Sequence, residues 1–448
     1  MSIQISKSTK WIALFVLFLL LVPYFWASLY AFPAADDYCW SWDVVKHQLP
    51  LYKFLLYSYR DVHSRMTSDV FLYFAPLNVH SLLGYRLAPI VLMLLFLGSF
   101  FFFFQKLFRF QYLATALITL LFACGTFALF PCLAEAFYWY TGAWTYTLGT
   151  ILFFPFLWSL MHFSANKKLS AALLVIIAFT LCSTCSELHL MLCTGTLVLI
   201  LLYHLHAQTV HRDWFLVTCI LLVFVLLLVV APGNFHRNSM FSQQRDVYAI
   251  VYRSTVNSID FARAWMFNPF TLVMAFGILL FGEQLKIKVI PIVFTLLFLA
   301  MLLFISVFVL TYIQGIIGQL RTVNAVTPMF LLGYFYLLLC LRNNYLQTFA
   351  LQFPASGALW FVLVVVAIIY TKNTTILYAE LADGTIANCY AEQVVQQEKI
   401  MHSNAPNLED VPTLSKRSII VNYDIKPGEK NFVNNCPRIY LSNMGVLQ

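Results

Sequence analysis

The chain has 448 residues, of which 61% are hydrophobic and only 10% are charged, and its mean hydropathy is +0.80. A soluble globular protein is nearer half apolar and a quarter charged, so this composition excludes that class. The formal net charge is +8. Its placement along the chain indicates membrane topology rather than a nucleic-acid partner, and we expect no nucleic acid to bind.

Apolar runs of about twenty residues recur along the chain, each long enough to cross a hydrocarbon core of roughly 30 Å. The first run, 11–29, follows Lys7 and Lys10. It is too long for a typical cleaved signal peptide, so we expect an anchor helix. The runs are continuous rather than alternating, which favours helices over strands. The sequence therefore predicts an all-α polytopic membrane protein with about eleven transmembrane helices. The further predicted spans are 87–104, 112–130, 146–163, 169–185, 188–203, 214–231, 269–281, 289–312, 325–341 and 357–370.

Basic residues are distributed unevenly between the two sets of predicted loops. With the N-terminus in the cytoplasm, the inner loops hold ten of the 27 basic residues but only two of the 19 acidic residues. The positive-inside rule requires such a bias. We therefore expect a cytoplasmic N-terminus and, after an odd number of spans, an extracytoplasmic C-terminus.

The predicted outer segments are long, whereas the inner ones are short. Outer loops cover 33–86 and 232–268, within a transmembrane domain of residues 1–370. Residues 371–448 have ordinary polar composition and contain "KPGEK" and the alternating "SIIVNYDI". This pattern predicts a small extracytoplasmic α+β domain.

Two outer stretches, 41–66 and 245–267, mix aromatic with basic residues and are too polar to span a membrane. Such segments lie in the headgroup plane with their apolar face down. They either cover the helix bundle or wall a cavity that is open to lipid.

The ten cysteines carry little functional signal. Cys182 and Cys185 form a CxxC inside a span, but no second CxxC completes a metal site. Buried free cysteine behaves as a small hydrophobe, which is the favoured interpretation. Cys389 and Cys436 both fall in the C-terminal segment, and they can pair if that compartment is oxidising.

Polar residues gather at the predicted outer ends of the spans, where charged groups are costly and usually functional. By this topology they all lie on one side of the membrane, which indicates a single outer-leaflet site. The candidates are Asp36, Asp37, Arg86, Glu135, Tyr138, Trp139, Tyr146, Glu187, His189, Asn234, Arg237 and Arg321.

Each candidate also has a purely structural interpretation. One aspartate can cap the next helix, but the adjacent pair Asp36 and Asp37 exceeds that need and suits catalysis or a divalent cation such as Mg²⁺ or Mn²⁺. Glu135 is either a solvated loop acid or a site acid. Arg237 and Arg321 can contact lipid headgroups, yet the guanidinium fork matches phosphate bidentately.

The remaining candidates leave similar alternatives open. Glu187 and His189 form either a buried hydrogen-bonded pair or part of the site. The aromatic residues 138–146 form either an interfacial belt or a platform for a sugar ring.

Four short motifs resemble a bacterial membrane family within the GT-C superfamily of glycosyltransferases. They are "AADDYC", "EAFYWYTGAWTY", "APGNFHR" and "GQLRT", with the shared ADDY, YWxTG and APGNxxR patterns on Ala35–Tyr38, Tyr138–Gly142 and Ala231–Arg237 and a late arginine at Arg321. The resemblance covers most of the membrane part in order, whereas the C-terminal segment shows only a loose likeness.

The resemblance implies an inverting glycosyltransferase of the bacterial cytoplasmic (inner) membrane. It would transfer a sugar from a polyprenyl-phosphate donor to a cell-surface glycan or glycolipid on the extracytoplasmic face. Asp36 or Asp37 would be the general base, with a slight preference for Asp37, and Arg237 and Arg321 would bind the phosphate. Glu135 and Glu187 are further catalytic candidates. No Gly-rich phosphate loop appears, so a lipid-linked donor is favoured over a nucleotide sugar.

Two other classes remain open. A flippase or transporter would place ionisable residues near the membrane midplane and alternate access between the two sides. A surface-polysaccharide polymerase or ligase would share the carrier-phosphate chemistry but join whole glycans.

Overall fold

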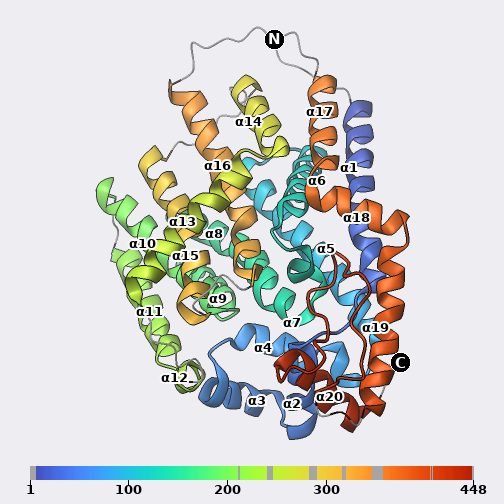
Figure 1. Ribbon diagram of the computed structural model, residues 1–448. Coiled ribbons are helices and arrows are strands. Elements are labelled where there is room, and N and C mark those ends of the chain that lie inside the picture. Colours follow the sequence, from blue (N-terminus) through green and yellow to red (C-terminus); the bar gives the residue numbers. More distant parts are fainter. Residues whose placement is uncertain are drawn as a thin grey trace.

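The computed structural model describes residues 7–209, 212–239, 246–281, 290–314, 319–345, 357–403, 405 and 407–445, and within these ranges every regular element is a helix (Figure 1). The expected all-α membrane class is confirmed at that level. The α+β fold expected for residues 371–448 is wrong, because the described part of this segment contains helices and irregular chain and no strand.

Eight helices are long and apolar enough to cross a membrane, and two bent helix pairs raise this to ten among the described residues, against about eleven expected. The eight spans are Lys7–Tyr30, Leu82–Phe108, Tyr112–Leu129, Tyr140–Asn166, Glu187–His206, Arg212–Val229, Ile292–Val309 and Arg321–Asn344. A shorter apolar helix, Leu169–Ser183, accounts for one further expected span. Many large apolar side chains on the bundle surface are exposed, such as Phe15, Ile177 and Leu226, as in a bundle that faces lipid.

The membrane helices and their continuations have the following bounds. They are α1 (Lys7–Ala27), η1 (Ser28–Tyr30), α5 (Leu82–Phe108), α6 (Tyr112–Leu129), η4 (Ala134–Tyr138), α7 (Tyr140–Gly142), η5 (Ala143–Thr147), α8 (Leu148–Asn166), α9 (Leu169–Ser183), α10 (Glu187–His206), α11 (Arg212–Val229), α15 (Ile292–Gln314) and α16 (Arg321–Tyr345).

The short helices of residues 33–81 gather at the end of the bundle opposite Lys7, which we call the distal end (Figure 1). The predicted interfacial stretch 41–66 is broken into several of them. These elements are α2 (Asp36–His47), α3 (Leu51–Tyr57), η2 (Ser58–Val62), α4 (Met66–Tyr73) and η3 (Pro76–Val79), joined there by α12 (Pro232–Ser239). The predicted outer loop 33–86 therefore forms a helical layer at this end.

The second predicted interfacial stretch, 245–267, has a different place in the structure. It forms α13 (Val247–Met266), which packs along α15 and leads at 67° into α14 (Pro269–Phe281). Ser258 in α13 is buried and donates a hydrogen bond to the Leu303 carbonyl oxygen in α15. The two helices together have the length and apolar composition of one bent span or of a re-entrant pair, and α13 packs against the bundle helix α15. Arg245 of this stretch, and Lys286 and Lys288 of the predicted inner loops, lie outside the described residues.

Aromatic side chains fill the centre of the bundle between α5, α6 and η4. Phe96, Phe100, Phe127 and Phe137 are each at most 1% exposed, and their ring centroids lie 4.5–5.9 Å apart along the chain of contacts. Edge-on packing of this kind suits the quadrupole of the rings. The result is a rigid base beneath the polar residues of the distal end.

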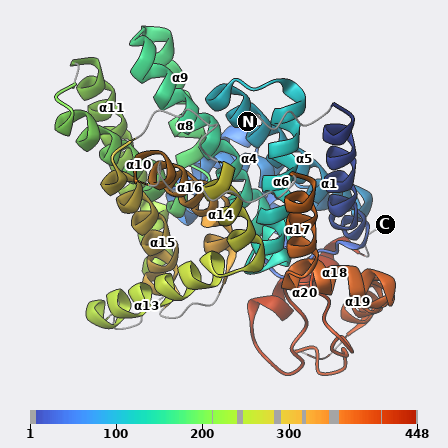
Figure 2. The same ribbon diagram turned by 90° about the horizontal axis from the view of Figure 1, so that it is seen from above.

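The C-terminal segment lies along the flank and distal end of the bundle (Figures 1 and 2). It begins with α17 (Gly357–Ile369), which meets α18 (Lys372–Ala382) at a bend of 68°, and continues through α19 (Thr385–His402) to α20 (Phe432–Met444). Its irregular part is held by side chains. Glu380 accepts hydrogen bonds from the Ser418 hydroxyl and the Ile419 N–H, and Asp424 accepts one from the Leu414 N–H.

A disulfide joins Cys436 in α20 to Cys39 in α2. The pairing of Cys436 with Cys389 is therefore wrong, and Cys389 is a buried free cysteine. The bond ties the end of the chain to the helix that carries Asp36 and Asp37.

Candidate functional site

The two aspartates open α2 directly after a strained residue. Ala35 has φ 48° and ψ −115°, a conformation that alanine rarely adopts and that costs on the order of 1–3 kcal/mol. Hydrogen bonds to the Asp37 carboxylate offset the cost of this backbone conformation. The carboxylate accepts them from the Ala34 N–H (3.1 Å), from the Thr141 N–H (2.8 Å) and hydroxyl (2.6 Å), and from the Tyr85 hydroxyl (2.6 Å).

These bonds separate the roles of the two acids. Asp37 is 4% exposed and both of its oxygens are engaged, so it fixes the start of α2 against α5 and α7. Burial raises its pKa to about 6, and the hydrogen bonds from Thr141 and Tyr85 oppose that rise. Asp36 is half-buried, and no described residue donates a hydrogen bond to its carboxylate. The geometry therefore leaves the carboxylate of Asp36, rather than that of Asp37, available to a ligand.

Three arginines from different parts of the chain act on Asp36. Burial raises its pKa, and the positive charges of Arg321, Arg237 and Arg65 oppose that rise. The carboxylate therefore lies within electrostatic range of the three guanidinium groups, although Asp36 and Arg321 are far apart in the sequence.

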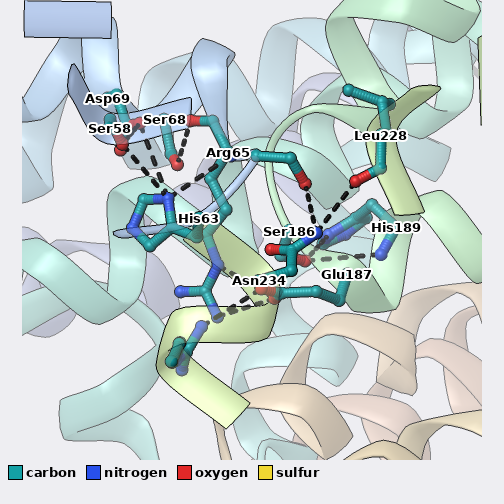
Figure 3. Close-up of polar contacts among 12 residues, drawn as sticks. Ser58, His63, Arg65, Ser68, Asp69, Ser186, Glu187, His189, Leu228 and Asn234 are labelled. Carbon is teal, nitrogen blue, oxygen red and sulfur yellow. Dashed lines mark hydrogen bonds and ion pairs between the residues drawn. The ribbon is translucent and has the colours of Figure 1, made fainter. Parts of the chain in front are cut away.

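Glu187 joins two of these arginines. Its Oε2 lies 2.6 Å from Arg65 Nη2 and 2.9 Å from Arg65 Nε, and its Oε1 lies 3.1 Å from Arg237 Nη1 (Figure 3). Ser186 caps the helix by accepting a hydrogen bond from the His189 N–H, which places Glu187 in the first turn of α10. Burial alone would lower the pKa of Arg65, but Glu187 holds it above its usual value. For Arg237 the charge of Arg65 lowers the pKa.

A buried polar network supports Arg65 from behind (Figure 3). The Ser58 hydroxyl donates to Asp69 Oδ2 at 2.5 Å, and His63 Nδ1 lies 3.6 Å from the same oxygen. Burial raises the pKa of Asp69 to about 7, opposed by the Ser58 hydrogen bond, and burial also lowers the pKa of His63. Both groups are at most 3% exposed. This network fixes the backbone from which Arg65 extends.

The glycine and asparagine of "APGNFHR" explain how Arg237 reaches this place. A Cβ atom on Gly233 would lie 2.6 Å from the backbone nitrogen of His63, so only glycine allows α12 to pack this closely on η2. Asn234 donates hydrogen bonds to the Ser64 hydroxyl (3.2 Å) and to the Leu228 carbonyl oxygen (2.8 Å). Asn234 is therefore a clamp between α11, α12 and the Arg65 loop.

Arg321, the first residue of α16, differs from the other two arginines. Its Cζ lies 5.0 Å from the ring centroid of Trp139 and 5.1 Å from that of Tyr146, whose ring also lies 5.8 Å from Arg65 Cζ. The residue is only 8% exposed, its Nε has no hydrogen-bond partner among the described residues, and no carboxylate of those residues pairs with it within 4 Å. A buried guanidinium without a partner is costly, so this group is poised to bind an anion.

Glu135 and the C-terminal segment complete the cluster. Burial raises the pKa of Glu135 and the charge of Arg321 opposes this, while Glu135 Oε2 has no hydrogen-bond partner among the described residues. The Tyr423 hydroxyl accepts a hydrogen bond from Gln319 Nε2 (2.9 Å), and the Tyr423 ring meets Trp139 edge-on at 5.3 Å. We call Asp36, Glu135, Trp139, Tyr146, Arg65, Glu187, Arg237 and Arg321 the arginine cluster.

The surroundings of the aspartate pair do not suit a divalent cation. Asp37 accepts hydrogen bonds on both oxygens, and Asp36 lies among three guanidinium groups, which disfavour a further positive charge. Among the described residues no group of three or more His, Cys, Asp or Glu side chains has the arrangement of a metal site.

Five predicted site residues lie outside the cluster: Asp37 and Asn234, whose hydrogen bonds hold neighbouring helices in place, and Tyr138, His189 and Arg86. The Tyr138 hydroxyl donates to the Tyr24 carbonyl oxygen, so this residue belongs to the core. His189 is fully buried, with Nδ1 2.8 Å from the Ser186 hydroxyl and the ring against Gly149. Arg86 points to α19, where it donates a hydrogen bond to the Tyr390 hydroxyl.

Arg65 and Tyr423 belong to the site although the sequence did not single them out. Arg65 stands in a stretch that contains several basic residues, and Tyr423 lies in the segment expected to form a strand. The residues around Arg65 include His63, Ser64, Ser68 and Asp69, which makes 63–69 unusually polar for a segment at the membrane surface. This polarity was the feature of the sequence that could have identified Arg65 as a site residue.

Comparison of the chain with protein-family models, with curated proteins and with solved structures gives no match.

Proposed function

We propose that the protein transfers a sugar from a polyprenyl-phosphate-linked donor to a cell-surface glycan or glycolipid on the extracytoplasmic face of a bacterial cytoplasmic membrane. One observation carries this proposal. A buried arginine that makes no ion pair within 4 Å among the described residues, Arg321, is stacked between two aromatic rings and acts electrostatically on Asp36, a half-buried carboxylate without a hydrogen-bond donor. This combination suits a reaction with a phosphate leaving group and a hydroxyl nucleophile.

In the proposed step Asp36 removes the proton from an acceptor hydroxyl as its oxygen attacks the anomeric carbon of the donor sugar. The bond between the anomeric carbon and the phosphate oxygen breaks, and its electron pair remains on that oxygen. The polyprenyl phosphate gains one negative charge, which the guanidinium groups stabilise where it develops. A single base opposite the leaving group gives inversion at the anomeric carbon.

The three arginines contribute differently to binding the phosphate. Glu187 holds Arg65 and Arg237 in a fixed pair, so their net charge toward a ligand is reduced to about one positive unit. Arg321 has no such partner among the described residues and is free to contact the phosphate directly. Trp139 and Tyr146 offer aromatic faces on which a sugar ring can stack.

Two further observations support the orientation. The basic residues of the predicted inner loops favour a cytoplasmic N-terminus. The Cys39–Cys436 disulfide joins two segments at the distal end, and disulfides persist in oxidising compartments such as the periplasm. A transporter is less well supported, because its ionisable residues would lie near the midplane, whereas α2 and α12 lie at one end of the bundle (Figure 1).

The test uses full-length protein in proteoliposomes that also contain membrane glycolipids as acceptors. A panel of synthetic isoprenyl-phosphate sugars is supplied, and both the released isoprenyl monophosphate and the glycosylated acceptor are measured by mass spectrometry. We expect release with the lipid-linked donor and none with nucleotide sugars alone. Turnover with a nucleotide sugar alone would contradict the proposal, as would full activity in Asp36→Asn.

A further inference from the structure

A small polar cavity lies between α19 and the stretch of chain that leads into α2. Its volume is about 30 Å³, and it is partly open to the outside. No cationic side chain of the described residues lines it. The polar and backbone groups that matter below come from Ala35 and Tyr38 at the start of α2, Gln393 and Gln397 in α19, and Tyr423 and Asp424 in the C-terminal segment.

Two glutamines of this cavity have unpaired amide atoms. Gln393 is 6% exposed and Gln397 is 3% exposed, yet Gln393 Oε1 and Gln397 Nε2 have no hydrogen-bond partner among the described residues. They are one helical turn apart and therefore lie on the same face of α19. Gln396 differs, because its Nε2 donates to the Pro412 carbonyl oxygen (2.8 Å) and to Asp424 Oδ1 (2.9 Å). A buried amide atom without a partner is unfavourable, so Gln393 and Gln397 are suited to bind a polar group.

More unpaired atoms lie on the other side of Tyr423. In the part of the chain that the structure describes, fifteen buried side-chain atoms lack a hydrogen-bond partner, and seven of them lie around residues 422–424. Buried polar groups are normally paired, so this concentration indicates a place for a polar ligand. Tyr423 belongs to both sides, since it lines the cavity, accepts a hydrogen bond from Gln319 and meets the Trp139 ring. The five atoms beyond Tyr423 are Glu135 Oε2, Trp139 Nε1, Gln319 Oε1, Arg321 Nε and Asn422 Nδ2.

The chemistry of the cavity selects a neutral hydroxyl group. The carboxylate of Asp424 is engaged at both oxygens, by Gln396 Nε2 and by the Leu414 N–H, so it attracts a cation only weakly, and no cationic side chain is present for an anion. The unpaired amide atoms are one acceptor and one donor, and a single hydroxyl group can satisfy both. A volume of about 30 Å³ is close to that of one water molecule in the liquid. The cavity therefore admits a hydroxyl-sized group and leaves a sugar ring outside.

We propose that this cavity binds one hydroxyl group of the acceptor glycan, which donates to Gln393 Oε1 and accepts from Gln397 Nε2. The ligand class rests on the proposed function, but the cavity is distinct from the arginine cluster. Ala35 and Tyr38 line the cavity and flank Asp36 in the sequence, and Tyr423 lies within electrostatic range of Asp36. A glycan held here extends past Tyr423 toward the acid that would remove its proton.

The experiment uses full-length protein in nanodiscs and fluorescein-labelled neutral trisaccharides of hexoses and N-acetylhexosamines. Fluorescence polarisation gives the Kd of each probe. Gln393→Leu and Gln397→Leu keep the size of the side chain but remove its amide, and each should raise the Kd of the tightest probe about 2- to 12-fold. The Tm should not fall, because an unpaired buried amide is replaced by an apolar chain.

A matched control and two contrary outcomes make this test decisive. Glu398→Gln changes an exposed side chain of α19 and should leave the Kd as in wild type. A wild-type Kd in both leucine variants would mean that the cavity holds only ordered water, and it would overturn the proposal. Failure of every trisaccharide to bind the wild-type protein would overturn it as well.

Deoxy analogues of the tightest probe identify the hydroxyl group concerned. The analogue that lacks it should bind wild type more weakly, but it should bind Gln397→Leu no more weakly than the parent trisaccharide does, because both changes remove the same contact. Losses that add for every analogue would contradict the assigned contact.

Transfer kinetics separate the acceptor from the donor. In proteoliposomes with membrane glycolipids, both leucine variants should raise the KM for the acceptor and keep the wild-type KM for the lipid-linked donor. A rise confined to the donor KM would overturn the assignment to the acceptor. Probe binding that depends on the two glutamines, without any transfer in the wild type, would refute the proposed function alone. Transfer with a wild-type acceptor KM in both variants would refute this inference alone.

Discussion

The sharpest prediction concerns Arg321→Gln. The substitution removes a guanidinium that is 8% exposed and stacked on Trp139 and Tyr146. A hydrogen bond to a charged group contributes about 1.5–3 kcal/mol. Because about 1.4 kcal/mol corresponds to a factor of ten, kcat/KM for an isoprenyl-phosphate sugar should fall about 10- to 150-fold.

The effect on stability should differ from the effect on activity. The two ring contacts contribute about 0.5–2 kcal/mol each, but burying a charge without an anionic partner costs a comparable amount. These terms oppose each other, so the Tm of Arg321→Gln should remain within a few degrees of wild type. An arginine with a purely structural role would instead lower Tm and activity together.

The assay compares Arg321→Gln and Arg321→Lys with Arg109→Gln, which removes an exposed arginine at the other end of the bundle. Release of isoprenyl monophosphate, measured over a range of donor concentrations, gives kcat and KM separately. Arg321→Lys keeps the charge but loses the fork, so it should retain intermediate activity. Wild-type kcat/KM in Arg321→Gln, or an equal loss in Arg109→Gln, would refute the reasoning.

Three further substitutions test the remaining parts of the site. Asp36→Asn should lower kcat about 100- to 10,000-fold with little change in Tm. Asp37→Asn should also lower Tm, because the substitution weakens the hydrogen bonds from Thr141 and Tyr85. If Asp36→Asn lowered Tm and Asp37→Asn did not, Asp37 would be the base and Asp36 the structural residue. Arg237→Gln removes a positive charge that lowers the pKa of Asp36, so the pKa of Asp36 should rise. The acid limb of the pH–rate profile should therefore move to higher pH. A shift of that limb to lower pH would contradict the prediction. Cys436→Ser should destabilise the protein by about 2–4 kcal/mol, measured by thermal unfolding against a Cys389→Ser control, because the bond to Cys39 closes a very long loop.

Hydropathy and local motifs predicted the parts of the fold that depend on short stretches of sequence. The membrane class and the positions of most spans follow from run length alone, because a bilayer fixes the length of a helix. The gathering of Asp36, Glu187, Arg237 and Arg321 also follows from topology, since each stands near the same end of its span.

The features that were missed depend on long-range contacts. The alternating "SIIVNYDI" has the period of a strand, yet the hydrogen bonds of this irregular segment go to side chains such as Glu380 and Asp424. The partner of Cys436 lies 397 residues away, so spacing within the C-terminal segment gave no information about it. Which aspartate is free was equally hidden, because the donors to Asp37 come from Thr141 and Tyr85.

The arrangement of charges explains why this site tolerates three arginines, of which Arg65 and Arg321 are buried and Arg237 is half-buried. Glu187 neutralises part of the charge of Arg65 and Arg237, and it does so through bonds that keep both guanidinium groups in place. A fixed positive field of this kind needs no reorganisation when negative charge develops on a leaving phosphate. Arg321 is the costly member, because its guanidinium is buried without a direct ion pair among the described residues, with Asp36 and Glu135 acting on it only at longer range. Under the proposed function, the phosphate of the donor would supply a direct anionic partner for Arg321 and offset that cost.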